Sequence, residues 1–181
     1  AIEPSDQNDV IVGIDFGRSP SAVFCQNLSL GRWIIFGEYV TQDMGAQRFA
    51  EGLKREIARN KWDKLTFRFI GDPAGNQMAQ TNETTPFMIL RAAGIKAYPA
   101  NTNDTSIRIE SVEGVINRLV DGKPGMVISP ICTNLISGFE GGYNYKRMVY
   151  MGSEKYDEKP NKNRFSHVHD ALQYAMLGGG E

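Results

Sequence analysis

The sequence has little cysteine and no long apolar run. It contains two cysteines among 181 residues, Cys25 and Cys132. They belong to no CxxC spacing, which argues against a zinc site and a disulfide framework, so we expect two reduced cysteines in the core. No segment reaches the roughly 18 consecutive apolar residues that a membrane span needs, and residues 1–9 are too polar for a signal peptide. We therefore expect an intracellular protein with no membrane partner.

The sequence also has almost no net charge and lacks several common catalytic motifs. The formal net charge of −1 provides no overall field that would favour a polyanion, so any nucleic-acid surface must be a local patch. There is no Walker-type phosphate loop, so these residues alone cannot form an ATP-driven motor. The absence of a cysteine cluster and of an HExxH run argues against a zinc mechanism.

Hydrophobic periodicity and turn residues predict a mixed α/β sheet. Strands are expected at residues 10–15, 21–28, 32–40, 65–72, 95–99 and 124–129. Helices are expected at residues 44–62, 86–93, 106–122, 131–139 and 164–177. The first three strands follow one another closely, which implies antiparallel hairpins, and strands then alternate with helices. This order predicts one sheet that is first antiparallel and then parallel, with helices on both faces.

Two of the predicted helices carry specific expectations. In the first, Asp43 is the expected N-cap, and Phe49, Leu53 and Ile57 recur at steps of four on the buried side. For the helix at 106–122, the residues expected to face inward are Ile109, Val112, Ile116 and Leu119. The basic residues of the first helix are interpreted mainly as its solvated face: Arg48, Lys54, Arg55, Arg59 and Lys61.

Two aspartates end predicted strands. Asp15 closes the strand VIVGID, and Asp72 closes LTFRFIGD. A turn-forming or helix-capping aspartate is the simpler explanation of either residue alone. Ligands of α/β folds bind outside the carboxyl ends of strands, however, so the two carboxylates together indicate one shared cleft.

The last predicted helix supplies a third acid. At about 100° per residue, His167, Asp170 and Tyr174 share one side of it. The apolar residues share the other side: Phe165, Val168, Leu172, Ala175 and Met176. The polar stripe is typical of either a solvated face or a functional site, and both interpretations stay open. His169 lies nearer the apolar side, which favours a hydrogen-bonded core histidine.

Basic residues gather just before this helix, interspersed with tyrosines. They are Lys146, Arg147, Lys155, Lys159, Lys162 and Arg164. Such a segment suits contacts with a phosphate backbone, which dominate nucleic-acid affinity, but a solvated hairpin with ordinary surface lysines explains it equally well. Arg18, just beyond Asp15, is a further candidate for a DNA phosphate, although a surface arginine is the simpler explanation.

The three carboxylates suit a metal site. Asp15, Asp72 and Asp170 offer the oxygen ligands that Mg²⁺ and Mn²⁺ prefer. Two such ions about 3.5–4 Å apart stabilise the attacking and leaving oxygens of an in-line phosphoryl displacement. The pattern therefore favours a phosphodiester hydrolase with Mg²⁺ or Mn²⁺, and two ions are expected when DNA is bound.

Three motifs together resemble one family. GIDFG around Asp15, GDPAG at Asp72 and SHVHDALQY around Asp170 resemble the nuclease domain of the large terminase subunit of tailed bacteriophages, which belongs to the ribonuclease H-like superfamily. The resemblance covers residues 10–177, and GDPAG and the H-x-x-D-A-x-x-Y ending are its more specific parts. It implies a ribonuclease H-like fold, metal-binding catalytic acids at Asp15, Asp72 and Asp170, and a catalytic histidine at His167.

The resemblance also implies a biological role. The family's nuclease is a metal-dependent endonuclease that cuts concatemeric viral double-stranded DNA before and after a capsid is filled. An ATPase motor precedes it in the same polypeptide and drives DNA through the portal, and a small terminase subunit is a further expected partner. Residues 1–181 would then be a single nuclease domain, the C-terminal part of a longer chain that acts in the host-cell cytoplasm.

Three alternatives stay open on the sequence alone. GIDFGRS also looks like the first phosphate loop of actin-like and Hsp70-like ATPases, which would make the chain a nucleotide-binding lobe. The same fold and metals would serve a Holliday-junction resolvase or a transposase-like nuclease. A nuclease-like module that only binds partners is the third possibility.

Overall fold

The centre of the molecule is a mixed six-stranded sheet in the order β5-β4-β1-β2-β3-β8. The structure, a computed structural model, describes residues 1–76, 84–142 and 165–181. The strands of the sheet are β1 (Val10–Asp15), β2 (Ser21–Asn27), β3 (Trp33–Val40), β4 (Phe67–Gly71), β5 (Ala97–Pro99) and β8 (Met126–Ile128). β1, β2 and β3 pair antiparallel, and β4, β5 and β8 join parallel to their neighbours. The predicted mixed sheet is confirmed.

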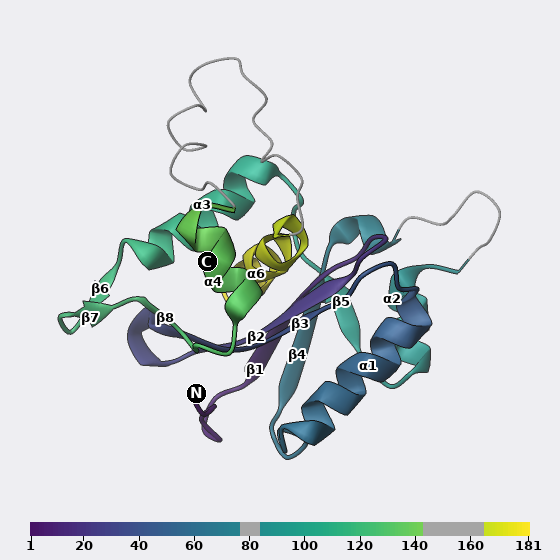
Figure 1. The fold of residues 1–181 in the computed structure, drawn as a ribbon. Coiled ribbons are helices and arrows are strands. Elements are labelled where there is room, and N and C mark those ends of the chain that lie inside the picture. The colour runs from purple at the N-terminus through teal and green to yellow at the C-terminus, as the bar shows by residue number, and fades with distance from the viewer. Residues whose placement is uncertain (77–83, 143–164) are drawn as a thin grey trace.

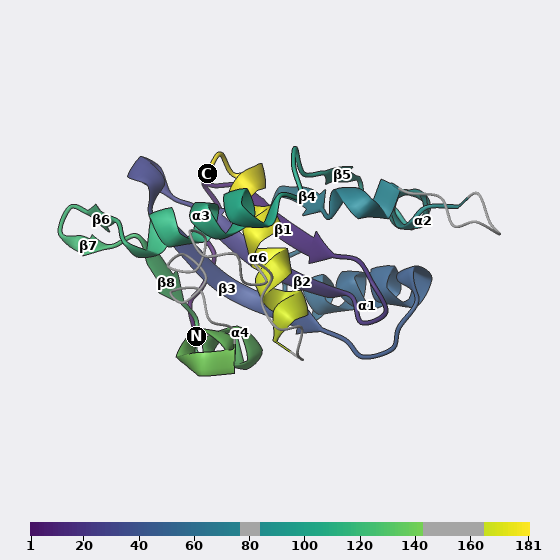
Figure 2. The same cartoon turned by 90° about the horizontal axis from the view of Figure 1, so that it is seen from above.

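Helices cover both faces of this sheet, as predicted (Figures 1 and 2). In the described ranges they are α1 (Ala46–Arg59), α2 (Pro86–Ala92), α3 (Thr105–Ile116), α4 (Thr133–Ser137) and α6 (Ser166–Gly178). α6 crosses one face of the sheet and packs against α3 and α4, while α1 and α2 pack on the other face. None of these helices has the length and apolar character needed to cross a membrane.

β1 lies at the centre of both cores, which explains its composition. Alternate residues of a strand point to opposite faces, so Ile11 packs toward α6 while Val10, Val12 and Ile14 pack toward α1. All residues of β1 are buried. A strand with helices on both faces is apolar throughout, which makes the single carboxylate at its end, Asp15, conspicuous.

The predicted start of the first helix is wrong. Its N-cap is Gly45, not Asp43. Asp43 has a left-handed backbone conformation with φ of 47°, and its carboxylate lies 2.6 Å from Nε of Arg18. An N-cap residue has an extended backbone, so Asp43, with its left-handed conformation three residues before the helix begins, does not cap it.

The predicted inward face of the next long helix is wrong at its C-terminal end. α3 stops at Ile116, which is 38% exposed, and Leu119 is 73% exposed. Leu119 instead belongs to a two-stranded ribbon formed by β6 (Leu119–Val120) and β7 (Lys123–Pro124). Asp121 and Gly122 connect its strands with positive φ angles. An Asp-Gly pair is a strong two-residue hairpin turn, and here it overrides the helical periodicity.

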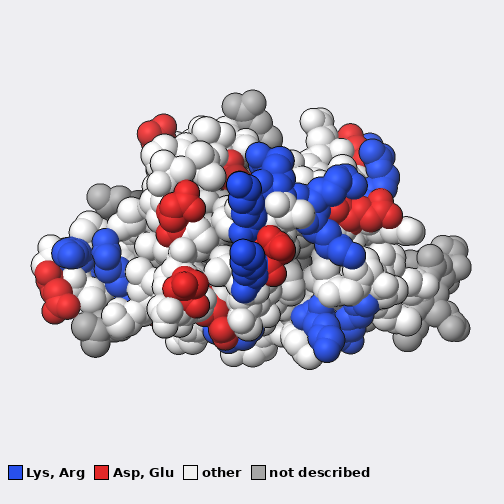
Figure 3. All heavy atoms as spheres, turned by 90° about the horizontal axis from the view of Figure 1, so that it is seen from below, with Lys and Arg blue, Asp and Glu red and all other residues white. Residues whose placement is uncertain are grey.

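The surface charges are mixed. The basic residues of α1 and the following turn are exposed, as predicted for a solvated face. Arg59 is paired within the helix, with Nη2 lying 2.6 Å from Oε1 of Glu56. On the underside of the molecule, Lys and Arg side chains lie beside Asp and Glu side chains (Figure 3). Such mixed charge gives no reason to assign a nucleic-acid surface to this face.

Two cysteines and one histidine lie buried in the core. Cys25 and Cys132 are both buried and reduced, as predicted. His169 is also buried: its Nε2 lies 2.9 Å from the carbonyl oxygen of Leu135, and its ring meets the ring of Phe139 edge to face at 4.6 Å. The prediction of a hydrogen-bonded core histidine is confirmed. Burial lowers the pKa of His169 to about 4.

This histidine predicts a loss of stability in acid. The unfolded chain binds a proton at His169 below its ordinary pKa of about 6.5, whereas the folded chain does so only near 4. Between these values the unfolded state binds more protons, so the free energy of unfolding falls by roughly 3 kcal/mol as the pH drops from 6.5 to 4. Urea unfolding in EDTA across this range measures the effect. His169→Gln, whose amide can still donate to Leu135, should show a shallower slope, and an unchanged slope would contradict the assignment.

Candidate active site

Asp15 and Asp72 lie side by side at one edge of the sheet. β1 and β4 are neighbouring parallel strands, and Ile14 pairs with Gly71, so the two aspartates follow in register. The backbone N–H of Asp72 continues the pairing by donating to the carbonyl of Ile14 at 3.0 Å. Oδ1 of Asp72 accepts a hydrogen bond from the N–H of Ala74 at 2.9 Å. Asp72 is therefore a turn-forming aspartate and also a neighbour of Asp15.

A close contact between β1 and α6 brings the third acid to the same edge. Gly13 has no side chain, and the backbone of α6 occupies the space where a Cβ would stand, next to Ala171 and Ala175. Glycine and alanine at a contact allow two backbones to approach closely. Asp170 precedes Ala171, so the contact that packs the helix on the strand also places this carboxylate near the end of β1.

The carboxylate of Asp170 is paired with an arginine. Nη2 of Arg108 lies 2.6 Å from its Oδ1, and the Arg108 and Asp170 side chains are 11% and 18% exposed. The Arg108 guanidinium also lies over the ring of Tyr174, with its central carbon 4.7 Å from the ring centroid. Arg108 comes from the first turns of α3, so this ion pair joins α3 to α6.

The carboxylate of Asp15 is paired with a histidine. Nδ1 of His167 lies 2.7 Å from Oδ2 of Asp15, a hydrogen bond in which the ring N–H donates. Asp15 is 5% exposed, and burial raises its pKa, with the nearby Asp72 acting in the same direction. His167 and Arg108 act in the opposite direction and favour the charged carboxylate. Burial is the largest of these effects, so the pKa of Asp15 lies above its ordinary value.

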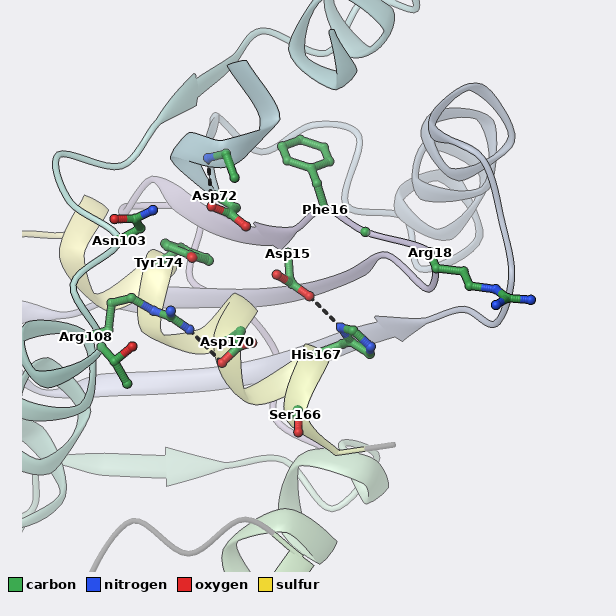
Figure 4. Close-up of a pocket in the computed structure, with 13 residues that line it drawn as sticks. Asp15, Phe16, Arg18, Asp72, Asn103, Arg108, Ser166, His167, Asp170 and Tyr174 are labelled. Carbon is green, nitrogen blue, oxygen red and sulfur yellow. Dashed lines mark hydrogen bonds and ion pairs between the residues drawn. The ribbon is translucent and has the colours of Figure 1, made fainter. Parts of the chain in front are cut away.

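These side chains line one pocket of about 390 Å³. Figure 4 shows Asp15, Asp72 and Asp170 arranged around a common space, with His167 on one side and Arg108 on the other. At about 30 Å³ per water molecule, the pocket has room for a hydrated cation and a phosphate group. The remaining lining residues are Phe16, Gly17, Arg18, Ala74, Asn103, Thr105, Ser166 and Tyr174.

The carboxylates of the pocket are chemically suited to a hard divalent cation, but they are not arranged around one position. Carboxylate oxygens are the ligands that Mg²⁺ and Mn²⁺ prefer. Within residues 1–76, 84–142 and 165–181, however, no group of three or more His, Cys, Asp or Glu side chains is arranged to hold a metal ion. Two of the three carboxylates instead contact side chains of the protein: Asp15 contacts His167, and Asp170 contacts Arg108.

The other predicted binding residues have different outcomes. Arg18 lines the pocket, but its side chain is 87% exposed, pairs with Asp43 and extends away from the three acids (Figure 4). The six basic residues predicted to contact DNA, Lys146, Arg147, Lys155, Lys159, Lys162 and Arg164, lie outside the described residues. Their role stays a prediction.

Arg108 is the pocket residue that sequence reasoning missed. It precedes Val112 and Val115 by four and seven residues, so it lies on the buried stripe of α3. A lone arginine on an apolar stripe needs a carboxylate or another acceptor in the interior. That pattern was visible in the sequence, but it does not say which acid is the partner.

Comparisons with solved structures identify the fold. The large terminase of the thermophilic bacteriophage D6E matches with a TM-score of 0.66 and 22% identity over 96% of this chain and 40% of that one. The large terminase nuclease domain of bacteriophage P22 matches with a TM-score of 0.66 and 15% identity, over 98% and 84% of the two chains. That of bacteriophage SPP1, with bound Mn, gives 0.56 and 18%, over 93% and 85%.

A resolvase is also similar, at a lower score. The yeast mitochondrial Holliday junction resolvase Ydc2 gives a TM-score of 0.52 and 12% identity, over 93% of this chain and 77% of that one. No protein-family model and no curated protein matches the sequence. The chain spans about 40% of the length of the D6E large terminase. It has the ribonuclease H-like nuclease fold that the large terminase nuclease domains share.

Proposed function

We propose that this chain is a metal-dependent endodeoxyribonuclease, the nuclease domain of a terminase large subunit that cuts concatemeric viral DNA during packaging. The observation that carries the proposal is the convergence of Asp15, Asp72 and Asp170 on one pocket in a fold shared with terminase nuclease domains. Each acid has a local contact, to Ala74, His167 or Arg108. Three carboxylates on one pocket nevertheless supply the oxygen donors that a divalent cation prefers.

Asp15, Asp72 and Asp170 would hold the metal, with Mg²⁺ or Mn²⁺ as the ion and two ions when DNA is bound. Bound divalent ions polarise a phosphodiester and lower the pKa of an attacking water. The SPP1 nuclease domain, which shares the fold, was solved with bound Mn. The oxygen donors of this pocket suit the same class of ion.

The chain's own residues have distinct tasks in this proposal. The pairing of β1 with β4 holds Asp15 and Asp72 rigidly, which fixes the position of any ligand between them. His167 orients the Asp15 carboxylate through its 2.7 Å hydrogen bond and is placed to exchange a proton with a group in the pocket. Arg18 and the basic residues between 143 and 164 would contact the backbone of double-stranded DNA.

The wider role is part of the same proposal. In the full-length protein an ATPase motor would precede this domain, with the small terminase subunit and the portal as partners in the host-cell cytoplasm. The length comparison with the D6E large terminase supports the existence of a further domain, because this chain aligns with 40% of that protein. The full-length protein would then package DNA, and the domain described here would cut it.

Plasmid cleavage tests the proposed activity. With Mn²⁺ or Mg²⁺ the chain should nick and linearise supercoiled plasmid with little sequence preference, because the site holds the DNA through its phosphates. EDTA should abolish cleavage, and excess Mn²⁺ should restore it. Tight binding of ATP without any cleavage would instead favour the nucleotide-binding lobe.

The resolvase alternative has one specific observation in its favour, the similarity to Ydc2. A resolvase of this fold should cut a synthetic four-way junction much faster than linear duplex of the same sequence. A terminase nuclease should cut both at similar rates per duplex arm. Measuring the two substrates side by side under the same Mn²⁺ concentration separates these functions.

A further inference from the structure

The ion pair between Arg108 and Asp170 places a cation in the acidic pocket. The distance of 2.6 Å and the low exposure of both side chains make it a partly buried pair. Surface ion pairs contribute little, but removing one partner of a buried pair leaves the other charge uncompensated. The positive charge of Arg108 therefore stabilises a charged Asp170 in this structure.

Arg108 is held in this position from two directions. Its guanidinium stacks over Tyr174, one turn after Asp170 on α6, and cation–π contacts of this kind are attractive. Asp104 caps the start of α3, the helix that carries Arg108: its Oδ1 accepts a hydrogen bond from the N–H of Ile107 at 3.2 Å. The same guanidinium opposes, in small part, the rise that burial causes in the pKa of Asp15, so its charge acts on more than one acid of the pocket.

While Arg108 contacts Asp170, the three acids do not form a metal-binding cluster. Asp170 directs Oδ1 to Arg108 (Figure 4), and in the described ranges no three acidic or imidazole side chains are set for one metal ion. A divalent cation bound to Asp170 would also lie near the positive guanidinium that contacts this carboxylate, and like charges repel.

We propose that Arg108 is an internal counter-ion that competes with the divalent metal for Asp170, so that metal binding requires Arg108 to release this carboxylate. This proposal rests on the proposed metal-dependent function and adds a way of regulating it. The pocket is stable without metal, and it binds an ion only when the ion pair between Arg108 on α3 and Asp170 on α6 breaks. Coupling between two such events is reciprocal, so metal binding weakens the ion pair by the same factor by which the ion pair weakens metal binding.

Calorimetric titration with Mn²⁺ alone tests the competition. Arg108→Gln removes the competing charge, and its Mn²⁺ dissociation constant should fall about tenfold, within the usual range of coupling between sites. The matched control is Arg18→Gln, which removes the same charge from an exposed side chain on the pocket wall and should change the constant less than about twofold. An Arg108→Gln constant equal to that of wild type or of Arg18→Gln would overturn the proposal.

A second measurement uses the unmodified protein, so it does not depend on how Arg108→Gln folds. Titration with Mg²⁺ should shift the side-chain Nε–H resonance of Arg108 in nitrogen–proton NMR, with the dissociation constant that calorimetry with Mg²⁺ gives. An unmoved resonance at saturating Mg²⁺ would overturn the competition while leaving metal binding intact. Absence of any metal binding by wild type and by Arg108→Gln would instead overturn the nuclease proposal as well.

Discussion

Replacing any one of the three pocket aspartates by asparagine should reduce plasmid cleavage by about 10³-fold or more. Asparagine keeps the size of the side chain but removes the negative charge that a hard cation needs. Loss of several kcal/mol of Lewis-acid stabilisation corresponds to a change of this order in rate. Single-turnover cleavage in Mn²⁺ by Asp15→Asn, Asp72→Asn and Asp170→Asn measures it. The exposed Asp63 offers a matched control, and Asp63→Asn should cleave like wild type.

The same variants should differ from one another in metal-free stability. Burial raises the pKa of Asp15, so folding favours its protonated form, and the stability that this form contributes is lost as the pH rises through the folded-state pKa. Asp15→Asn should therefore unfold at the same or a higher temperature at neutral pH. Asp170→Asn should be less stable, because it leaves Arg108 buried without its counter-ion.

Normal plasmid cleavage by all three variants would show that these aspartates do not form the catalytic site.

His167 should matter less than the acids. His167→Ala removes the hydrogen bond to Asp15 but leaves all three carboxylates, so we expect roughly a 10²-fold loss, the lower end of what a general acid or base contributes. A shift in the pH profile of the remaining activity would distinguish proton transfer from simple positioning of Asp15.

Adding one methyl group at Gly13 should destabilise the whole domain by at least about 3 kcal/mol, the upper range for overpacking a core. A Cβ built there would stand 2.7 Å from the backbone nitrogen of Ala175 and 2.8 Å from its Cβ, and it would also overlap the carbonyl oxygen of Ala171. Backbone atoms of a helix cannot move aside individually, so α6 as a whole must shift. Urea unfolding of Gly13→Ala measures the cost.

Two further variants make this test specific. Gly114→Ala lies in α3, where a Cβ would meet nothing within 4 Å, and it should be neutral or stabilise by about 0.5–1 kcal/mol through helix propensity. Combining Gly13→Ala with Ala175→Gly should restore only part of the lost stability, because the Ala171 carbonyl remains in place. A stability of Gly13→Ala within about 0.5 kcal/mol of wild type would mean that α6 and β1 are less tightly packed than described.

Much of this fold was predictable because local signals and burial agree. The apolar runs of β1, β2 and β3 predict these strands correctly, because a strand in the middle of a covered sheet must be apolar along most of its length. The two errors arise where a local turn competes with periodicity. Asp121 and Gly122 form a hairpin turn that ends α3 early, and Asp43 turns the chain before α1 begins.

The site was predictable only in part. Asp15 and Asp72 can be brought together from sequence because both end strands, and parallel neighbours end at the same edge. Asp170 followed from helical spacing together with a family resemblance. The partner of Asp170 did not, because Arg108 lies on another helix and 62 positions away along the chain. Long-range pairing of side chains depends on tertiary packing, which no local pattern encodes.

The pairing of His167 with Asp15 has a consequence for how the domain is made. These residues lie 152 positions apart, and the helix that carries His167 and Asp170 comes after every strand of the sheet. Contacts between distant parts of a chain form late in folding because loop closure costs entropy. During synthesis from the N-terminus, a growing chain can pair β1 with β4 long before α6 exists. The pocket is therefore completed last, and under the proposed function a chain that ends before α6 should not cleave DNA.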